Sequence, residues 1–261
     1  MKTTYKLLPV VAMTIATLII TPAFAVSDNA SSNGQNGSSS GSSNMCTHLA
    51  NLQTSGNNNV NAKITALQSQ YSQQLAKIES DQASVQQNLL TTRISANNQF
   101  EEKITALEAI DGLTDEQLQA IETYAESMRT AEATRETAVD TAISDYKTGL
   151  ESLVSDNQQS MTQAGETFRA AIASAFSVAV SNCSDESNVM TTLRASVKTA
   201  RENFSSNRQG SGSTMSDDIQ ALRTTRNEAV KTANQTFAAS AKEYSQTLAE
   251  VLGDLAISSE E

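Results

Sequence analysis

Asp111-Gly112-Leu113-Thr114-Asp115-Glu116-Gln117-Leu118 is the stretch that decides the fold. Gly112 has no Cβ and can take the left-handed conformation that ends many helices. Thr114 fits the N-cap of a following helix, with Gln117 three residues later able to complete a capping box. Asp115 and Glu116 then fall in the first turn, where the helix dipole favours negative charge. Stop and start signals this close together predict a tight reversal between two antiparallel helices.

Apolar residues at helical spacing run through most of the chain on both sides of this turn. Before it, Phe100, Ile104, Leu107 and Ile110 recur at steps of three and four residues. The final segment has the clearest coiled-coil pattern, interrupted only by Arg226: Ile219, Leu222, Ala229, Ala233, Phe237, Ala241, Tyr244, Leu248, Val251 and Leu255. The chain has only two prolines, as uninterrupted helices require. The sequence therefore predicts an all-α fold.

Two further breaks suggest how many helices there are. Ser184 offers a second N-cap and marks a second reversal, and a Gly- and Ser-rich segment at 207–213 marks a third break. A reversal near Thr114 makes residues face each other when their numbers add up to about 229, and one near Ser184 gives about 369. Leu255 then lies opposite Thr114, so three antiparallel segments of similar length close.

We therefore predict an elongated, coiled-coil-like antiparallel bundle of three long helices, the third interrupted near 207–213. At about 1.5 Å per residue, each helix would be roughly 100 Å long. A four-helix bundle is the alternative, but it loses the match at Leu255.

The first 25 residues have the three parts of a secretory signal peptide. Lys2 and Lys6 precede an apolar run from Leu7 to Ile20, and Ala23-Phe24-Ala25 fits a cleavage site. The run is shorter than the roughly 20 residues that a membrane span needs. We therefore expect cleavage after Ala25 and a secreted, periplasmic or cell-surface protein. Residues 26–45, rich in Ser, Gly and Asn, predict a disordered leader, which leaves 46–261 as the helical bundle.

The charge of the chain limits its partners. Its net charge is −11, and removing the signal peptide would remove two lysines and no acid. Nucleic acids and anionic membranes both require basic patches, so we expect neither as a partner. We expect a protein partner or self-association, with no membrane insertion after signal removal.

The two cysteines are the most informative pair in the chain. The numbers of Cys46 and Cys183 add up to 229, so the first hairpin brings them together. In an exported chain, an even cysteine count favours a disulfide. A metal site made of both cysteines, His48 and Asp185 or Glu186 is an alternative, although Cys-x-His is not a usual zinc-ligand spacing. Free thiols or a bond between two chains are the remaining possibilities, and His48 is expected to be solvated.

Polar side chains gather from Asp156 to Ser160 and at Gln163. The reversal near Ser184, which pairs residues whose numbers add up to about 369, places these residues opposite the 207–213 break. We expect looser packing there, which would serve as a hinge or a binding notch or would simply be a packing defect.

The sequence contains no phosphate-binding loop, nucleophile elbow or cofactor motif. We therefore expect no enzyme activity, no catalytic residue, no cofactor and no bound metal. The leading hypothesis is an exported acidic helical bundle with a structural or protein-interaction role at the bacterial envelope or exterior. The alternative is a periplasmic helical chaperone or carrier for client proteins, which an exposed apolar groove would mark.

Overall fold

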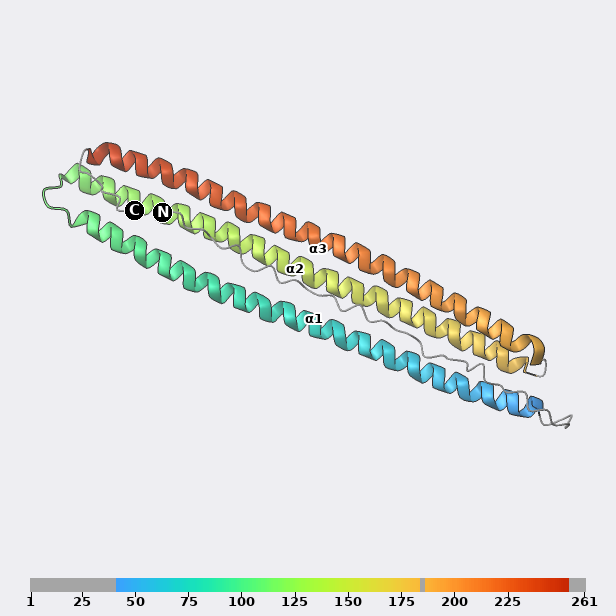
Figure 1. Cartoon of the computed structure of the whole chain (residues 1–261). Coiled ribbons are helices and arrows are strands. Elements are labelled where there is room, and N and C mark those ends of the chain that lie inside the picture. The colour runs from blue at the N-terminus through green and yellow to red at the C-terminus, as the bar shows by residue number, and fades with distance from the viewer. Residues whose placement is uncertain (1–40, 184–185, 254–261) are drawn as a thin grey trace, which may run out of the picture. The chain divides into compact units, whose positions relative to one another are not determined.

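The computed structural model describes residues 41–183 and 186–253, which form three long α-helices. They are α1 (Gly41–Glu108), α2 (Asp115–Ser181) and α3 (Glu186–Leu252). Within each of the two compact units described below, successive helical segments run antiparallel and pack side by side (Figure 1), and the described residues include no β-strand. The predicted all-α bundle of three long helices is confirmed.

The turn between α1 and α2 combines a left-handed glycine with a reciprocal cap. Gly112 has a φ of +84°. The Thr114 hydroxyl accepts a hydrogen bond from the Gln117 N–H at 3.2 Å, and the Gln117 side-chain oxygen accepts one from the Thr114 N–H at 3.0 Å. Two N–H groups that have no partner within the helix are thereby satisfied. Asp115 and Glu116 lie in the first turn of α2, at the positive end of its dipole.

The structure corrects two predicted boundaries. α3 continues without interruption through 207–213, where the sequence predicts a break. α1 begins at Gly41, so residues 41–45 are helical and do not belong to a disordered leader. A glycine inside a helix costs only about 1 kcal/mol relative to alanine, whereas burying one large apolar side chain contributes roughly 1.5–3 kcal/mol. Met215 and Ile219, both buried just after the predicted break, are enough to carry the helix through it.

Other predictions fall on residues that lie outside the described part of the chain. These are the signal peptide at 1–25, the leader from 26 to 40, the N-cap at Ser184 and the position of Leu255 opposite Thr114.

The helices form two compact units, each with a core of its own. The described residues of unit 1 are 77–151 and 219–253, and those of unit 2 are 41–76, 152–183 and 186–218. The core of unit 1 joins the ends of α1 and α3 to the start of α2, through Ile104, Ile121, Ala125, Leu248 and Leu252. The core of unit 2 joins the start of α1, the end of α2 and the start of α3, through Leu49, Val60, Phe168, Ile172, Ala175, Phe176, Ala179, Val189, Leu193 and Ala200.

Contacts within each unit establish the register of α1 against α2. In unit 1, Arg93 forms an ion pair with Glu136. In unit 2, the helices approach so closely at Gly165 that a Cβ there would lie 3.0 Å from the Ile64 side chain. The residue numbers add up to 229 in both pairs, which is the value predicted from the turn.

Arg226, which interrupts the coiled-coil pattern of α3, establishes the second register in unit 1. Its guanidinium carbon lies 4.5 Å from the centre of the Tyr146 ring on α2, close enough for a cation–π contact. In unit 2, the Ser211 hydroxyl of α3 donates to the Asn157 side chain of α2. The residue numbers of these two pairs add up to 372 and 368, which lie within one helical turn of the predicted 369.

Replacing either of two glycines by alanine should change the free energy of unfolding, in opposite directions for the two positions. Gly112→Ala places a Cβ at a φ of +84°, so we expect the free energy of unfolding to fall by about 1 kcal/mol or more. Gly210 lies inside α3, and a Cβ there would meet nothing within 4 Å. Gly210→Ala should therefore stabilise the protein by about 0.5–1 kcal/mol. Urea unfolding followed by circular dichroism measures both, and shifts in the same direction would contradict the assignment.

Candidate functional site

In unit 2, a disulfide joins α1 to the turn that follows α2. Cys46 and Cys183 are bonded, with their Cα atoms 5.4 Å apart, and Cys183 packs against the core of the unit. The bonded sulfurs cannot act as thiolate ligands, so the alternative metal site with His48 does not fit this structure. His48 is exposed, and no group of metal-ligating side chains occurs among the described residues.

A polar hollow lies between α2 and α3 of unit 2, where the sequence predicts loose packing. Its volume is about 690 Å³, and its walls include Asn157, Gln163, Asn207, Ser211 and Met215. The Ser211 hydroxyl donates to Asn157 Oδ1 at 2.5 Å, and Asn157 Nδ2 donates to the Met215 sulfur at 2.9 Å. The Asn157 side chain of α2 is thus held by two residues of α3, and α3 stays continuous beside the hollow.

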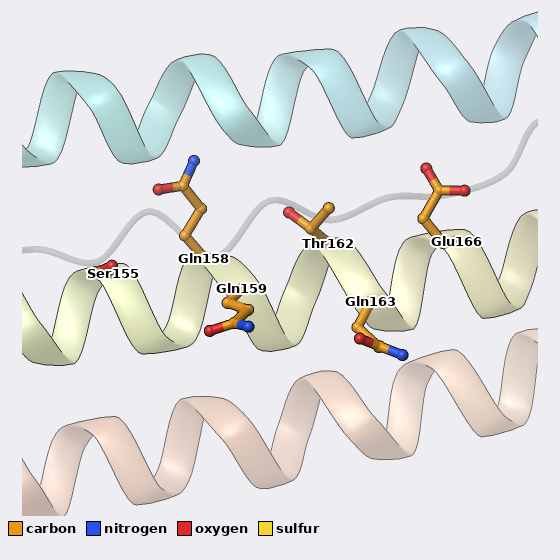
Figure 2. A pocket seen from close by; sticks show the side chains of 6 residues that line it. All are labelled: Ser155, Gln158, Gln159, Thr162, Gln163 and Glu166. Carbon is orange, nitrogen blue, oxygen red and sulfur yellow. The ribbon is translucent and has the colours of Figure 1, made fainter.

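The adjoining face of α2 carries a run of amide and hydroxyl groups (Figure 2). Gln158, Thr162 and Glu166 point to the side of α1, whereas Gln159 and Gln163 point to the side of α3. These side chains line an open depression of about 450 Å³. Amides and hydroxyls both donate and accept hydrogen bonds, so this face is suited to contact with a polar partner.

Unit 1 contains a different hollow, which we call the arginine hollow. Its volume is about 410 Å³, and its lining comes from all three helices: Arg93, Ile94, Ala96, Asn97, Phe100, Met128, Arg129, Glu132, Ala133, Glu136 and Phe237. Charged side chains therefore lie next to aliphatic and aromatic ones in a single depression.

Two paired arginines connect α1 and α2 at the arginine hollow. Arg93 of α1 donates to both Asp140 carboxylate oxygens, at 2.9 and 2.8 Å, and also forms an ion pair with Glu136 at 3.3 Å. Arg129 of α2 donates to both oxygens of Glu101, at 2.8 and 2.6 Å. Bidentate pairs of this kind are the stronger and more directional type of ion pair.

Arg135 lies deeper, with only 8% of its surface exposed. It forms an ion pair with Glu132, and its guanidinium carbon lies 4.7 Å from the centre of the Phe237 ring on α3. A buried charge needs such partners, because an unpaired one is strongly destabilising.

The carboxyl groups beside these arginines titrate differently. The two hydrogen bonds from Arg129 hold the pKa of Glu101 below its ordinary value. Burial raises the pKa of Glu132, although its pairing with Arg135 acts in the opposite direction. Glu132, which lines the hollow, and Glu101, which pairs with an arginine of its lining, therefore lie in two distinct electrostatic environments.

Charge is distributed unequally between the two units. The described residues of unit 1 contain 18 Asp and Glu against 10 Lys and Arg, whereas those of unit 2 contain six of each. The excess negative charge of the described chain thus belongs to the unit with the arginine hollow.

The apolar pattern of the sequence does not identify the arginine hollow, because its defining side chains are charged. A signal was nevertheless present. The numbers of Arg93 and Glu136 add up to 229 and those of Glu101 and Arg129 to 230, so the register applied to charged residues pairs them.

None of the helices, over the residues that the structure describes, is both long enough and apolar enough to cross a membrane. Comparison with known proteins finds no matching family model and no significant match among curated proteins or solved structures.

The disulfide should contribute strongly to stability. It closes a loop with a sequence separation of 137, for which the chain-entropy model gives about 5 kcal/mol as an upper value. We expect Cys46→Ser/Cys183→Ser to lower the free energy of unfolding and to speed amide hydrogen exchange near Leu49 and Ala179. Exchange near Ile121, in the core of unit 1, serves as the internal control. Equal unfolding midpoints for the oxidised protein and the variant would contradict this role.

The two glutamates should respond oppositely to pH, as side-chain carboxyl ¹³C chemical shifts can measure. Glu132 should protonate at a higher pH than Glu101. A raised folded-state pKa gives Glu132 a stabilising contribution that is present below its unfolded-state pKa and lost as the pH rises through the folded value. The lowered folded-state pKa of Glu101 stabilises the folded protein at pH values above the unfolded-state pKa. This contribution is lost as the pH falls through the folded-state pKa. Arg129→Gln should raise the pKa of Glu101 and leave that of Glu132 unchanged. An equal rise in the pKa of Glu132 would contradict the assignment of the two shifts to different causes.

Proposed function

We propose that this chain is an exported, non-catalytic helical bundle that acts through protein contacts at the bacterial envelope or exterior. The disulfide between Cys46 and Cys183 is the observation that carries the proposal. Such bonds persist in oxidising compartments outside the cytoplasm and are rare inside it. The signal peptide predicted at 1–25 supports the same location.

Exposed apolar side chains in unit 1 support a role in protein contact. Leu90 and Ile94 are 52% and 53% exposed, and they lie one turn apart on the same face of α1. Ile94 also lines the arginine hollow. A single exposed apolar residue is ordinary on a protein surface, but adjacent ones beside a hollow are typical of an interaction site.

A periplasmic chaperone or carrier is the second candidate. Phe100, Met128 and Phe237 supply an aromatic and thioether lining to the arginine hollow, which favours contact with apolar groups of a client. We favour a defined partner because a hollow of about 410 Å³ holds a few side chains, and its charged lining imposes a geometry on them.

Export and contact can be tested together by expressing the full chain, tagged at its C-terminus, in a bacterial cell. We expect the protein in an extracytoplasmic fraction, starting at Val26 and containing a linked Cys46–Cys183 peptide by non-reducing mass spectrometry. A photo-crosslinking residue at exposed positions of both units, such as Leu90 and Val178, should form adducts with one or a few defined proteins.

Other results would separate the candidates. Adducts with many unrelated unfolded proteins would support the carrier over the structural role. A cytosolic protein with two thiols that react with an alkylating agent would contradict both.

A further inference from the structure

Met215 of α3 is buried, yet it borders an open polar space. Only 4% of its surface is exposed, but it belongs to the walls of the polar hollow of about 690 Å³ between α2 and α3 of unit 2. The other residues that line this hollow are mostly amides, hydroxyls and carboxylates, so water and small polar molecules can enter it. The Met215 thioether therefore lies next to a space that a small polar reagent can reach.

Asn157 of α2 holds the orientation of the Met215 sulfur. Asn157 Nδ2 donates to the sulfur at 2.9 Å, and Asn157 Oδ1 accepts a hydrogen bond from the Ser211 hydroxyl at 2.5 Å. Because Ser211 holds the oxygen end of the amide, the N–H end stays directed at Met215. A thioether sulfur has two lone pairs, and this hydrogen bond occupies one of them. The second lone pair is the one left for a reagent in the hollow.

Methionine thioethers are oxidised to sulfoxides, and hydrogen peroxide is a small polar oxidant that performs this reaction. The sulfur lone pair attacks one peroxide oxygen, so that an S–O bond forms and the O–O bond breaks. The proton of the transferred oxygen moves to the departing hydroxide, which leaves as water. The sulfur is oxidised by two electrons and the peroxide is reduced by two. Since the sulfur becomes a chiral centre, the lone pair that reacts determines which of two epimers forms.

We propose that Met215 is an oxidation site at which hydrogen peroxide in the polar hollow forms one sulfoxide epimer, because Asn157 covers the other lone pair of the sulfur. The new oxygen accepts hydrogen bonds, and the walls of the hollow contain donors for it, among them Gln163, Asn207 and Thr214. Methionine sulfoxide is reduced again by dedicated enzymes, so the site can take up oxidant repeatedly. The inference goes beyond the proposed function and does not depend on it.

Met161 of α2 provides a control of equal burial. It is also 4% exposed, but it is not among the residues that line the polar hollow or the adjoining depression on α2. The folded protein, with its disulfide intact, is treated with hydrogen peroxide, digested and followed by peptide mass spectrometry. We expect sulfoxide to form about fivefold faster at Met215 than at Met161, since the rate follows access to the sulfur. Equal rates, or a faster reaction at Met161, would overturn the proposal.

The ratio of the two epimers tests the part played by Asn157. The peptide that contains Met215 sulfoxide is treated separately with the two classes of methionine sulfoxide reductase, each of which accepts one epimer. We expect one class to restore nearly all of the methionine and the other almost none. Asn157→Asp keeps the acceptor for Ser211 but removes the N–H donor, so this variant should give both epimers in comparable amounts.

Gln158→Glu is the matched control, because it makes the same change from amide to carboxylate one residue later. Gln158 points to the side of α1 and lines the adjoining depression (Figure 2), so this variant should still give a single epimer. Circular dichroism checks that both variants remain helical. Both epimers from the parent protein, or the same ratio from the parent and Asn157→Asp, would overturn the proposal. If Asn157→Asp unfolds, the epimer ratio of the parent and the comparison with Met161 still decide.

Discussion

The chain can reverse where it does because Gly112 holds a backbone conformation that side chains with a Cβ avoid, and because Thr114 and Gln117 cap the next helix at once. Since each helical residue advances the chain by a fixed rise and rotation, the position of this reversal determines which side chains of α1 and α2 meet. A slip of one residue would turn a helix by about 100° and separate the apolar stripes. The disulfide and the pairing of Arg93 with Asp140 then hold a register that the turn has already selected.

Helix number, direction and register follow from the sequence because they depend on periodicity and on turn residues, both of which are local. The errors at 41–45 and 207–213 have a shared cause: both segments are rich in Gly and Ser, which favour non-helical structure in isolation. What keeps them helical is the burial of nearby side chains. Leu49 is fully buried a turn or so after the first segment, and Met215 is 4% exposed just after the second. The amino-acid composition of a segment indicates its local conformational preference, but it does not contain the tertiary packing that can override that preference.

The candidate site was harder to predict because its geometry depends on which charges face each other across helices. Arg93 occupies a position where the apolar stripe of α1 would continue, and a search for apolar periodicity counts it as an interruption. The position of Arg93 instead allows its guanidinium to reach two carboxylates of α2. Burial of Arg135 depends on Phe237 from α3, more than 100 residues later in the chain, and no local pattern contains that contact. The polar hollow at Asn157 was accessible to prediction because its polar residues are contiguous.

The covalent link between α1 and the turn after α2 also affects how the chain would withstand proteases. Residues 46 to 183 form a closed ring that includes the exposed turn at Gly112. A single cut anywhere in that ring leaves its two pieces joined, and the side chains that pack between α1 and α2 keep them aligned. α3 lies outside this ring, so a cut within α3 itself would leave the piece beyond the cut held by packing alone. The hairpin of α1 and α2 is therefore the part of the molecule best suited to survive nicking as a connected whole.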